Sequence, residues 1–370
     1  MMKTLFRNFI ELHRGYDLPK NKRISGDFPI VSSTGIVGKH NSYKVKGPGV
    51  ITGRSGTIGK VIFEKGCFWP LNTTLFVSDF KGNDPKYVYY WLQCFDLKHY
   101  TTGSTVPTLN RNDLSNLIID VPTINEQRKR REILEILDAK IATNIEISQQ
   151  LESMAKTIYD YWFLQFEFPD KDGKPYKSNG GKMIWNDQLK QEIPEGWKVS
   201  IVENILGDYP KTKTIKSQKY DQGSIYPIID QSEDNYICGY TDDKTKVLEL
   251  KDAIVFGDHS NVSKYINFPF ARGADGTQIL NSNTPRLPNY LLYQEIISLP
   301  EIEKGYSRHF KFLKMQSVIL PTLNISQKYM DTVKSMLSKQ RQISYENKEL
   351  KSLRDFLLPL LINGQVTISD

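Results

Sequence analysis

A glycine-rich segment at residues 53–60 is the first stretch of the sequence whose residue types could bind a phosphate group. A nucleotide-binding loop needs four residues between its outer glycines and a Ser or Thr directly after its lysine. Here five residues lie between those glycines, and Val61 follows the lysine. The spacing therefore argues against a nucleotide site and favours a glycine-rich turn, from which three side chains could still reach DNA: Arg54, Ser55 and Thr57.

Residues 267–270 read Asn-Phe-Pro-Phe, which is close to the motif that holds a target amine in amino-methyltransferases. Phe268 stands where that motif has its first proline, and no glycine-rich loop for a methyl donor precedes it. We interpret the segment as the end of a strand. The sequence offers no other convincing catalytic set, so we predict no catalytic residue and no methyl transfer by this chain.

The three cysteines, Cys67, Cys94 and Cys238, are widely spaced and include no Cys-x-x-Cys pair. That spacing favours neither a disulfide framework nor a zinc site. We expect three reduced, mostly packed thiols and no metal ion. No apolar run approaches the roughly 20 residues that cross a bilayer, and charged residues interrupt the first 15 positions, so we expect neither a membrane segment nor a secretory signal and predict a cytoplasmic protein.

The chain has 49 basic against 42 acidic residues, and its formal charge of +7 favours a polyanionic partner. Basic and polar loop residues gather in both halves, and we expect them to contact DNA, although solvated surface charges are the simpler alternative. They are Lys20, Lys22, Arg23, Lys39 and His40, with the glycine-rich turn above, in the first half, and His259, Lys264, Arg272, Arg308, His309 and Lys311 in the second. A further basic run, residues 128–131, is interpreted as a solvated helix face or as a contact for phosphate or an acidic subunit.

Two long stretches without Gly or Pro must position these residues, at 123–166 and 322–358. Thr123 and Glu126 have the spacing of a capping box, and Asn324 and Gln327 repeat it. Apolar residues recur every three or four positions, which predicts paired helices of the coiled-coil type. The expected seams contain Ile133, Leu137, Ile147, Leu151, Met154, Ile158 and Tyr161 in the first helix, Val333, Met336, Ile343, Leu350 and Leu357 in the second, and Asn144 and Asn347 as polar positions.

The fold class that follows is α+β, with two β-rich domains separated by two long antiparallel coiled-coil helices in an internal pseudo-twofold repeat. The expected boundaries are 1–122 for the first domain, 123–166 for the first helix, 167–195 for a linker, 196–321 for the second domain and 322–364 for the second helix. Loops are expected at residues 103–108 and around Gly305 and Ser307. A long, roughly twofold body suits duplex DNA with spaced half-sites.

The sequence resembles the specificity (S) subunit of type I restriction–modification systems over nearly its whole length. In the first half the resemblance rests on Gly-Tyr-Asp-Leu-Pro at 15–19, Gly-Ile-Val-Gly at 35–38, residues 53–59, Pro122 with Glu126-Gln127, and Tyr-Asp-Tyr-Trp-Phe at 159–163. In the second half it rests on Ile-Pro-Glu-Gly-Trp at 193–197, Gly-Ala-Asp-Gly-Thr at 273–277, Pro321 with Gln327, and the stretch 350–359.

The resemblance implies a non-catalytic subunit whose two target-recognition domains read an asymmetric, bipartite double-stranded DNA sequence in phage defence. It implies two methylation subunits that bind S-adenosylmethionine, restriction subunits that use ATP and Mg, and no cofactor in this chain. The alternatives are a single-chain DNA methyltransferase or nuclease, and a coiled-coil scaffold that binds only proteins. The recognised bases and the spacer length cannot be predicted from these residues.

Overall fold

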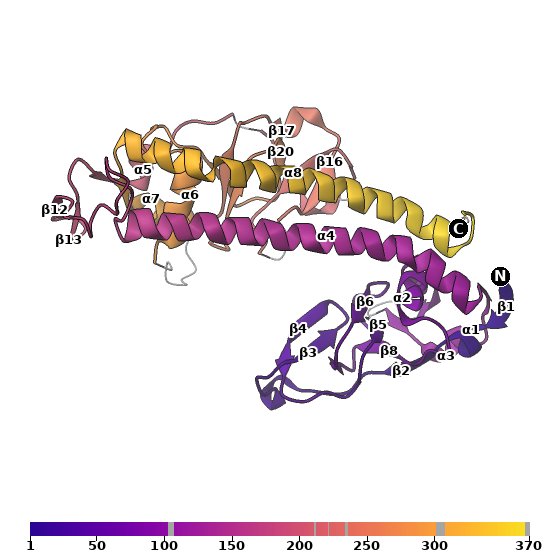
Figure 1. Cartoon of the computed structure of the whole chain (residues 1–370). Coiled ribbons are helices and arrows are strands. Elements are labelled where there is room, and N and C mark those ends of the chain that lie inside the picture. Colours follow the sequence, from indigo (N-terminus) through magenta and orange to yellow (C-terminus); the bar gives the residue numbers. More distant parts are fainter. Residues whose placement is uncertain (103–106, 211, 221, 234–235, 301–307, 367–370) are drawn as a thin grey trace. The chain divides into compact units, whose positions relative to one another are not determined.

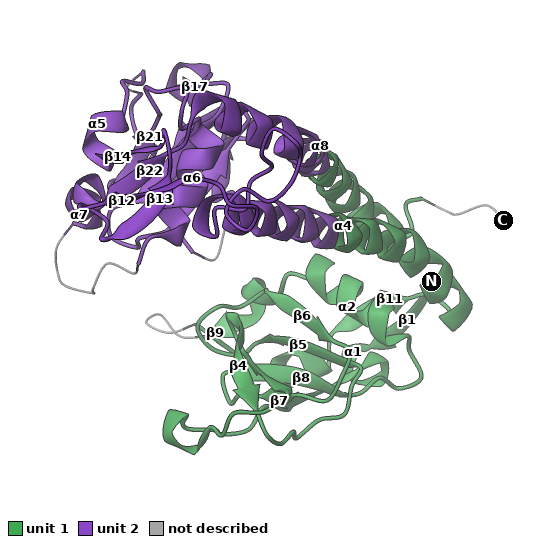
Figure 2. Ribbon diagram, turned by 60° about the vertical axis from the view of Figure 1, so that its left-hand side comes forward, with its two compact units in different colours: residues 1–144, 346–370 green, residues 145–345 purple. Residues whose placement is uncertain are grey.

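The computed structural model describes residues 1–102, 107–210, 212–220, 222–233, 236–300 and 308–366. The chain divides into two compact units (Figure 2): unit 1 is residues 1–144 with 346–370, and unit 2 is residues 145–345. Each unit therefore contains part of both long helices. Most of the loop expected at 103–108, and the loop expected around Gly305 and Ser307, lie outside the described residues.

The first long helix, α4 (Ile124–Tyr159), continues into a π-helical turn at Asp160–Leu164. Its predicted capping box is confirmed, since the Glu126 carboxylate accepts from the Thr123 N–H at 3.1 Å and the Thr123 hydroxyl accepts from the Glu126 N–H at 3.5 Å. The second long helix, α8 (Leu323–Ile362), already includes Asn324. The capping box expected there is wrong, because the Gln327 amide donates forward to Asp331 at 3.1 Å.

The two long helices run antiparallel in each unit (Figure 1). In unit 1, Asp138 of α4 meets Arg354 of α8 at 3.1 Å, and Arg130 donates to the Ile362 carbonyl at 3.1 Å. In unit 2, the Tyr329 hydroxyl donates to the Ala155 carbonyl at 3.2 Å. As the residue numbers rise along α4, the numbers of their partners in α8 fall, so the two helices are antiparallel.

The seam of α4 is shifted from the predicted one. Leu134, Ile141 and Ala155 are buried, whereas Met154 is 53% exposed and Tyr161 40% exposed. The small residue Ala155 occupies a seam position. The prediction assigns that position to its larger neighbour Met154, because it relies on the apolar pattern alone. The predicted seam of α8 agrees better with the structure, since Val333 and Ile343 are buried.

The basic run at 128–131 is only partly a solvated face. Arg130 is 9% exposed, and its bond to the last turn of α8 places a cation where that helix dipole is negative. Arg131 pairs with Asp84 at 3.1 Å and also with Glu135. These contacts explain why positive charge is tolerated near the start of α4.

Unit 1 joins short strands in three main sheets, with the hydrogen-bonded orders β1–β11, β2–β8–β5–β6 and β4–β3–β7. The strands are β1 (Met2–Leu5), β2 (Glu11–Arg14), β3 (Phe28–Ser32), β4 (Gly35–His40), β5 (Gly49–Gly53), β6 (Val61–Glu64), β7 (Trp69–Pro70), β8 (Thr74–Asp79) and β11 (Ile118–Val121). Strands β9 (Thr101–Thr102) and β10 (Thr108–Leu109) form a small pair. Helices α1 (Phe6–Phe9), α2 (Pro85–Cys94) and α3 (Arg111–Ser115) complete the unit.

Helix α2 begins where its sequence dictates. Asp84 caps it by accepting from the N–H groups of Lys86 at 3.0 Å and Tyr87 at 2.9 Å, and Pro85 suits the first helical position. Buried Gln127 of α4 accepts from the Asp84 N–H at 2.9 Å and donates to Asn83 at 2.7 Å. These bonds fix the start of α4 on the domain that precedes it.

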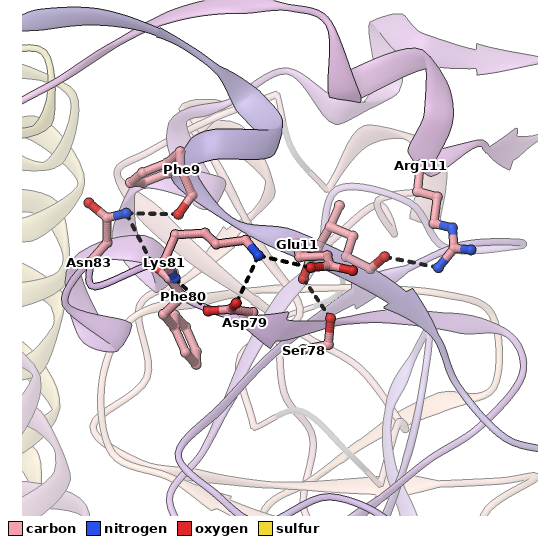
Figure 3. Close-up of polar contacts among 9 residues, drawn as sticks. Phe9, Glu11, Ser78, Asp79, Phe80, Lys81, Asn83 and Arg111 are labelled. Carbon is pink, nitrogen blue, oxygen red and sulfur yellow. Dashed lines mark hydrogen bonds and ion pairs between the residues drawn. The ribbon is translucent and has the colours of Figure 1, made fainter.

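Polar contacts around strands β2 and β8 hold the short helices α1 and α3 of unit 1 (Figure 3). Asn83 donates to the Phe9 carbonyl at 2.7 Å, and Lys81 pairs with Glu11 at 3.1 Å. Arg111, the first residue of α3, donates to the Leu12 carbonyl of β2 at 3.1 Å. The exposed ion pair contributes little to stability, but the two bonds to backbone carbonyls hold α1 and α3 in place.

Unit 2 has the sheet orders β14–β22, β21–β18–β19 and β16–β15–β20–β17, with a separate hairpin β12–β13. The strands are β12 (Met183–Asn186), β13 (Gln191–Pro194), β14 (Lys198–Ile201), β15 (Tyr226–Ile229), β16 (Gly239–Thr241), β17 (Val247–Leu248), β18 (Ala253–Gly257), β19 (Ser263–Ile266), β20 (Phe270–Arg272), β21 (Thr277–Leu280) and β22 (Ser317–Leu320). Its short helices are α5 (Val202–Ile205), α6 (Asn289–Ser298) and α7 (His309–Met315).

The predicted linker, 167–195, is folded rather than open. It contains the hairpin β12–β13, and Phe168 stacks on Trp197 with ring centroids 5.2 Å apart. Phe166 and Phe168 belong to the same buried core as Tyr329 of α8. The Pro and Gly residues of this segment therefore shape turns within unit 2.

The strand pairings of the two units correspond. Strand β5 pairs antiparallel with β6 and β8, as β18 does with β19 and β21. Strand β3 pairs antiparallel with β4 and parallel with β7, as β15 does with β16 and β20. The loops that leave these strands can therefore be compared position by position.

Candidate nucleic-acid interface

Three loops meet in unit 1, from the ends of β3, β5 and β7, and we call residues 32–35, 53–60 and 71–74 the unit 1 loop cluster. The Arg54 N–H donates to the Thr73 carbonyl at 2.8 Å. A Cβ atom at Gly53 would lie 1.8 Å from the Thr57 carbonyl oxygen and 3.2 Å from the Ser33 Cβ. Only glycine permits this approach of backbone to backbone.

The side chains of the unit 1 loop cluster are mostly polar and free to point outward. Thr57 is exposed, while Arg54 and Ser55 are half-buried. Arg54 holds the Asn72 carbonyl at 3.4 Å through one guanidinium nitrogen, and Lys60 donates to the Thr34 carbonyl at 2.5 Å. Guanidinium and hydroxyl groups on a fixed turn can bind phosphates or base edges.

The equivalent loops of unit 2 leave β15, β18 and β20, and we call residues 230–233, 257–262 and 273–277 the unit 2 loop cluster. Gln231 is its centre: its side chain accepts from the His259 N–H at 3.0 Å and donates to the Asp275 carbonyl at 3.2 Å. A Cβ atom at Gly276 would lie 2.7 Å from the His259 ring, and Gly276 has a φ of +91°. The three loops are thus tied together with His259 exposed beside them.

A buried polar cluster supports the unit 2 loops from below. The Asp230 carboxylate accepts from Tyr220 at 2.9 Å, Ser232 at 2.5 Å and Cys238 at 2.8 Å, and Lys264 donates to the Asp230 carbonyl at 2.9 Å. Burial acts to raise the pKa of Asp230, but these side-chain hydrogen bonds outweigh it and the pKa is lowered. Asp230 therefore stays ionised and fixes the residue next to Gln231.

The predicted contact residues of the first half are divided between surface and interior. Lys20, Lys22 and Lys39 are exposed, on a 3-10 turn at Lys20–Lys22 and on β4. Arg23 is half-buried and donates to the Leu18 carbonyl at 3.4 Å. His40 is buried, with Nδ1 3.0 Å from the Ile24 carbonyl oxygen and its ring edge-on to Trp69. The structure brings only Arg54, Ser55 and Thr57 together in the unit 1 loop cluster.

Those of the second half divide in the same way. His259, Arg308 and Lys311 are exposed, whereas Lys264 and His309 are buried. Burial lowers the pKa of Lys264, whose ammonium group faces Asp230. Arg272 is half-buried and donates to the Thr212 carbonyl at 3.4 Å.

Three polar residues of the unit 2 loops were not among the predicted contact residues: Asp230, Gln231 and Asp258. Asp230 and Asp258 directly follow strands β15 and β18, Gln231 follows Asp230, and none has a basic side chain that would mark it as a DNA contact. The place of Asp258 opposite Arg54 is already visible when residues 257–260 of the sequence are compared with residues 53–56, and in the structure Asp258 follows β18 as Arg54 follows β5.

Among the described residues, no group of three or more His, Cys, Asp or Glu side chains is placed to hold a metal ion. Over the same residues, no helix has both the length and the apolar character that crossing a bilayer requires.

Residues 7–153 match the family of the "Type I restriction modification DNA specificity domain". The chain is 26% identical to the type I restriction enzyme MjaIX specificity subunit of Methanocaldococcus jannaschii, over 88% of this chain and 79% of that protein. It is 23% identical to the HindI specificity subunit of Haemophilus influenzae, over 71% and 72% of the two chains. In fold it is similar to the crystal structure of a type I restriction–modification S subunit from M. genitalium, with a TM-score of 0.56 and 16% identity over 97% of this chain and 95% of the other. Residues 7–153 thus match the specificity domain of this family, and the chain as a whole is similar to type I restriction–modification specificity subunits.

Proposed function

We propose that this chain is the non-catalytic subunit that selects the DNA sequence for a type I restriction–modification complex. The observation that carries the proposal is the pair of loop clusters, which stand at corresponding places in two units yet have different residues. Equal scaffolds with unequal loops suit a target whose two halves differ. Unit 1 would read one half and unit 2 the other.

The proposed organisation is a duplicated chain with recognition domains at 1–122 and 196–321. Helices at 123–166 and 322–364 would act as coiled-coil spacers, with 167–195 connecting the halves. The corresponding strand orders and the antiparallel contacts between α4 and α8 support this organisation. The length of the helices would then set the spacing between the half-sites.

We propose a DNA-contact set restricted to side chains that solvent can reach. In unit 1 it is Lys20, Lys22, Arg23, Lys39, Arg54, Ser55 and Thr57, and in unit 2 His259, Arg272, Arg308 and Lys311. Exposed lysines on the flanking turn and strand suit phosphate contacts, which give affinity, and the loop clusters suit base contacts, which give sequence selection. His40, Lys264 and His309 are excluded because each is buried.

The chemistry would belong to the partners. As the resemblance to specificity subunits implies, two methylation subunits using S-adenosylmethionine and restriction subunits using ATP and Mg would assemble on this chain in the cytoplasm. The exposed faces of α4 and α8 are the proposed place of assembly. The complex would defend its host against phage DNA.

Mapping methylated adenines in a host with and without this chain tests the proposal. The expected map has one split, asymmetric sequence that depends on the chain. Replacing residues 1–120 with those of a relative should alter only one half of that sequence. Alteration of both halves would contradict independent reading, and methyl transfer or cleavage by the purified chain alone, abolished by a point mutation in it, would make it an enzyme instead.

A further inference from the structure

Arg54 and Asp258 occupy the same backbone position in their units. Each is the first residue after a central strand, and each N–H donates to a carbonyl of the neighbouring loop: Thr73 at 2.8 Å and Gly276 at 2.9 Å. The backbone carbonyls of Arg54 and Asp258 themselves accept hydrogen bonds, each from an N–H within one residue of the N-cap of a short helix. These bonds are Leu109 to Arg54 at 2.8 Å, before α3, and His309 to Asp258 at 3.0 Å, at the start of α7.

The two short helices are capped from different places. In unit 1, Asn110 is the N-cap of α3, and its own side chain accepts from the Asn112 N–H at 3.1 Å. In unit 2, the N-cap of α7 is Arg308, whose side chain caps nothing. The Asp258 carboxylate supplies the cap from the loop, because it accepts from the Phe310 N–H at 2.9 Å.

The arginine of each unit lies on the segment that does not supply the cap. Unit 1 carries its arginine on the loop, as Arg54, and unit 2 carries it at the helix start, as Arg308. The Arg308 side chain is 81% exposed, and its Nε lies 4.0 Å from the 5%-exposed Asp258 carboxylate. A contact of 4.0 Å holds the exposed guanidinium only weakly, and within the described part of the chain its remaining donors have no partner, so they can bind a ligand.

At the two positions compared, the first loop residue and the helix N-cap, each unit therefore has one arginine and one capping side chain, with the two roles assigned to opposite segments. Arg111, the residue after the N-cap of α3, is bound instead to the Leu12 carbonyl. The arrangement has an electrostatic reason. An arginine at position 258 would put a cation beside the positive end of α7 and beside Arg308, while leaving the Phe310 N–H without its cap. A loop arginine in unit 2 would thus require a capping residue at position 308.

We infer that Arg308 is the DNA-reading arginine of unit 2, the counterpart of Arg54, and that Asp258 is the residue that positions it. The inference rests on the proposed function and extends it, because it assigns specific roles within the unit 2 half-site. Arg308 supplies the charged donors to a guanine edge, and Asp258 fixes the backbone from which they extend. His309 and Phe310 contribute their N–H groups to that fixation.

Amide hydrogen exchange of the full chain tests the positioning role without DNA. Asp258→Arg should lose the protection of the Phe310 amide, and the double variant Asp258→Arg/Arg308→Asn should recover it, because an asparagine at the N-cap can cap α7 as Asn110 caps α3. Retained protection in the single variant, or a double variant no better than the single one, would overturn the positioning role. Asp258→Asn, which keeps an acceptor, is the milder variant if the arginine prevents folding.

DNA binding by the chain with its methylation partner tests the reading role, using the duplex found by methylation mapping and a duplex with the unit 2 half-site scrambled. Arg308→Ala should weaken binding to the intact duplex on the order of tenfold and leave binding to the scrambled one nearly unchanged. Arg341→Ala, an exposed arginine of α8 in the same unit, is the matched control. If the wild type distinguishes the two duplexes and Arg308→Ala binds both as the wild type does, the inference is overturned while the proposed function stands. Absence of wild-type discrimination would contradict the proposed function, and the exchange experiment would still decide the role of Asp258.

Discussion

The side-chain amide of Asn144 donates to the side-chain oxygen of Asn347 at 3.0 Å, joining α4 to α8 in the seam of unit 1. Both asparagines were predicted at seam positions, and the structure shows that they meet. Asn144 is buried, so its amide needs this partner. A polar pair in an apolar seam is satisfied in one register only and opposes sliding of one helix along the other.

Replacing one asparagine of this pair should destabilise unit 1. Asn144→Leu or Asn347→Leu leaves one amide without its partner and should lower the free energy of unfolding by about 1 kcal/mol. The double variant should recover that loss, because no polar group is then left unpaired. Urea denaturation measures all three, with Asn125→Leu on an exposed part of α4 as the control. Losses that simply add in the double variant would show that the pair does not interact.

A second contact links α2 to both long helices in unit 1. The Tyr90 hydroxyl donates to Asp138 at 2.7 Å, and Arg354 donates to the other carboxylate oxygen at 3.1 Å. Asp138→Ala should lower the free energy of unfolding by about 2 to 3 kcal/mol, since two partly buried donors lose their acceptor. Asp138→Asn keeps one acceptor and should cost about half as much. Equal losses in the two variants would mean that the methylene packing, rather than the hydrogen bonds, matters.

Buried Glu295 on α6 makes unit 2 sensitive to pH. Burial raises the pKa of Glu295 from 4.5 to about 7, against the smaller opposing effects of the nearby Tyr159 hydroxyl and the Ile319 backbone. A raised folded-state pKa means that the folded form binds the proton more tightly. The associated stability is full below pH 4.5 and is lost as the pH rises to about 7, by about 3 kcal/mol in total.

Glu295→Gln removes this titration and should flatten the fall of the melting temperature between pH 5 and about pH 7. At neutral pH the variant should be the more stable protein, since its amide carries no charge to bury. Thermal unfolding of both proteins across this range is the measurement. Glu146→Gln, an exposed glutamate of α4 in the same unit, should keep the wild-type pH profile. A profile for Glu295→Gln as steep as that of the wild type would place the titration elsewhere.

The exposed lysines of the first half should contribute affinity without sequence selection. Exchanging Lys20, Lys22 and Lys39 for glutamine should weaken DNA binding similarly on every duplex. It should also reduce the slope of log K against log salt by about 0.9 for each phosphate group that the variant no longer neutralises. Binding isotherms at several salt concentrations measure this slope.

Lys3 provides the control for that experiment. It is also exposed but lies on β1, at the end of unit 1 away from β4 and the loops (Figure 2). Lys3→Gln should leave both the affinity and the salt slope unchanged. A change of sequence preference in the triple variant would instead assign these lysines to base contacts.

The long helices were largely predictable from sequence, because their signals are local. A capping box spans four residues, and an apolar residue every three or four positions marks the buried side of a helix. The same reasoning failed at Met154, because the small residue Ala155 occupies the seam, and at Asn324, because α8 begins at Leu323, two residues before the start that a cap at Asn324 would give. A local sequence pattern predicts the presence of a helix more reliably than it predicts which face is buried or which residue is the first.

The sequence by itself thus determined two long helices, two β-rich regions and the family to which they point. Only the tertiary structure decided which polar residues surround the loops. Lys264 and His309 are basic like the others but lie inside, and Asp258 caps α7 from a loop some fifty residues earlier in the chain. Such contacts depend on how strands far apart in sequence pair, and no residue type or spacing near Asp258 announces them.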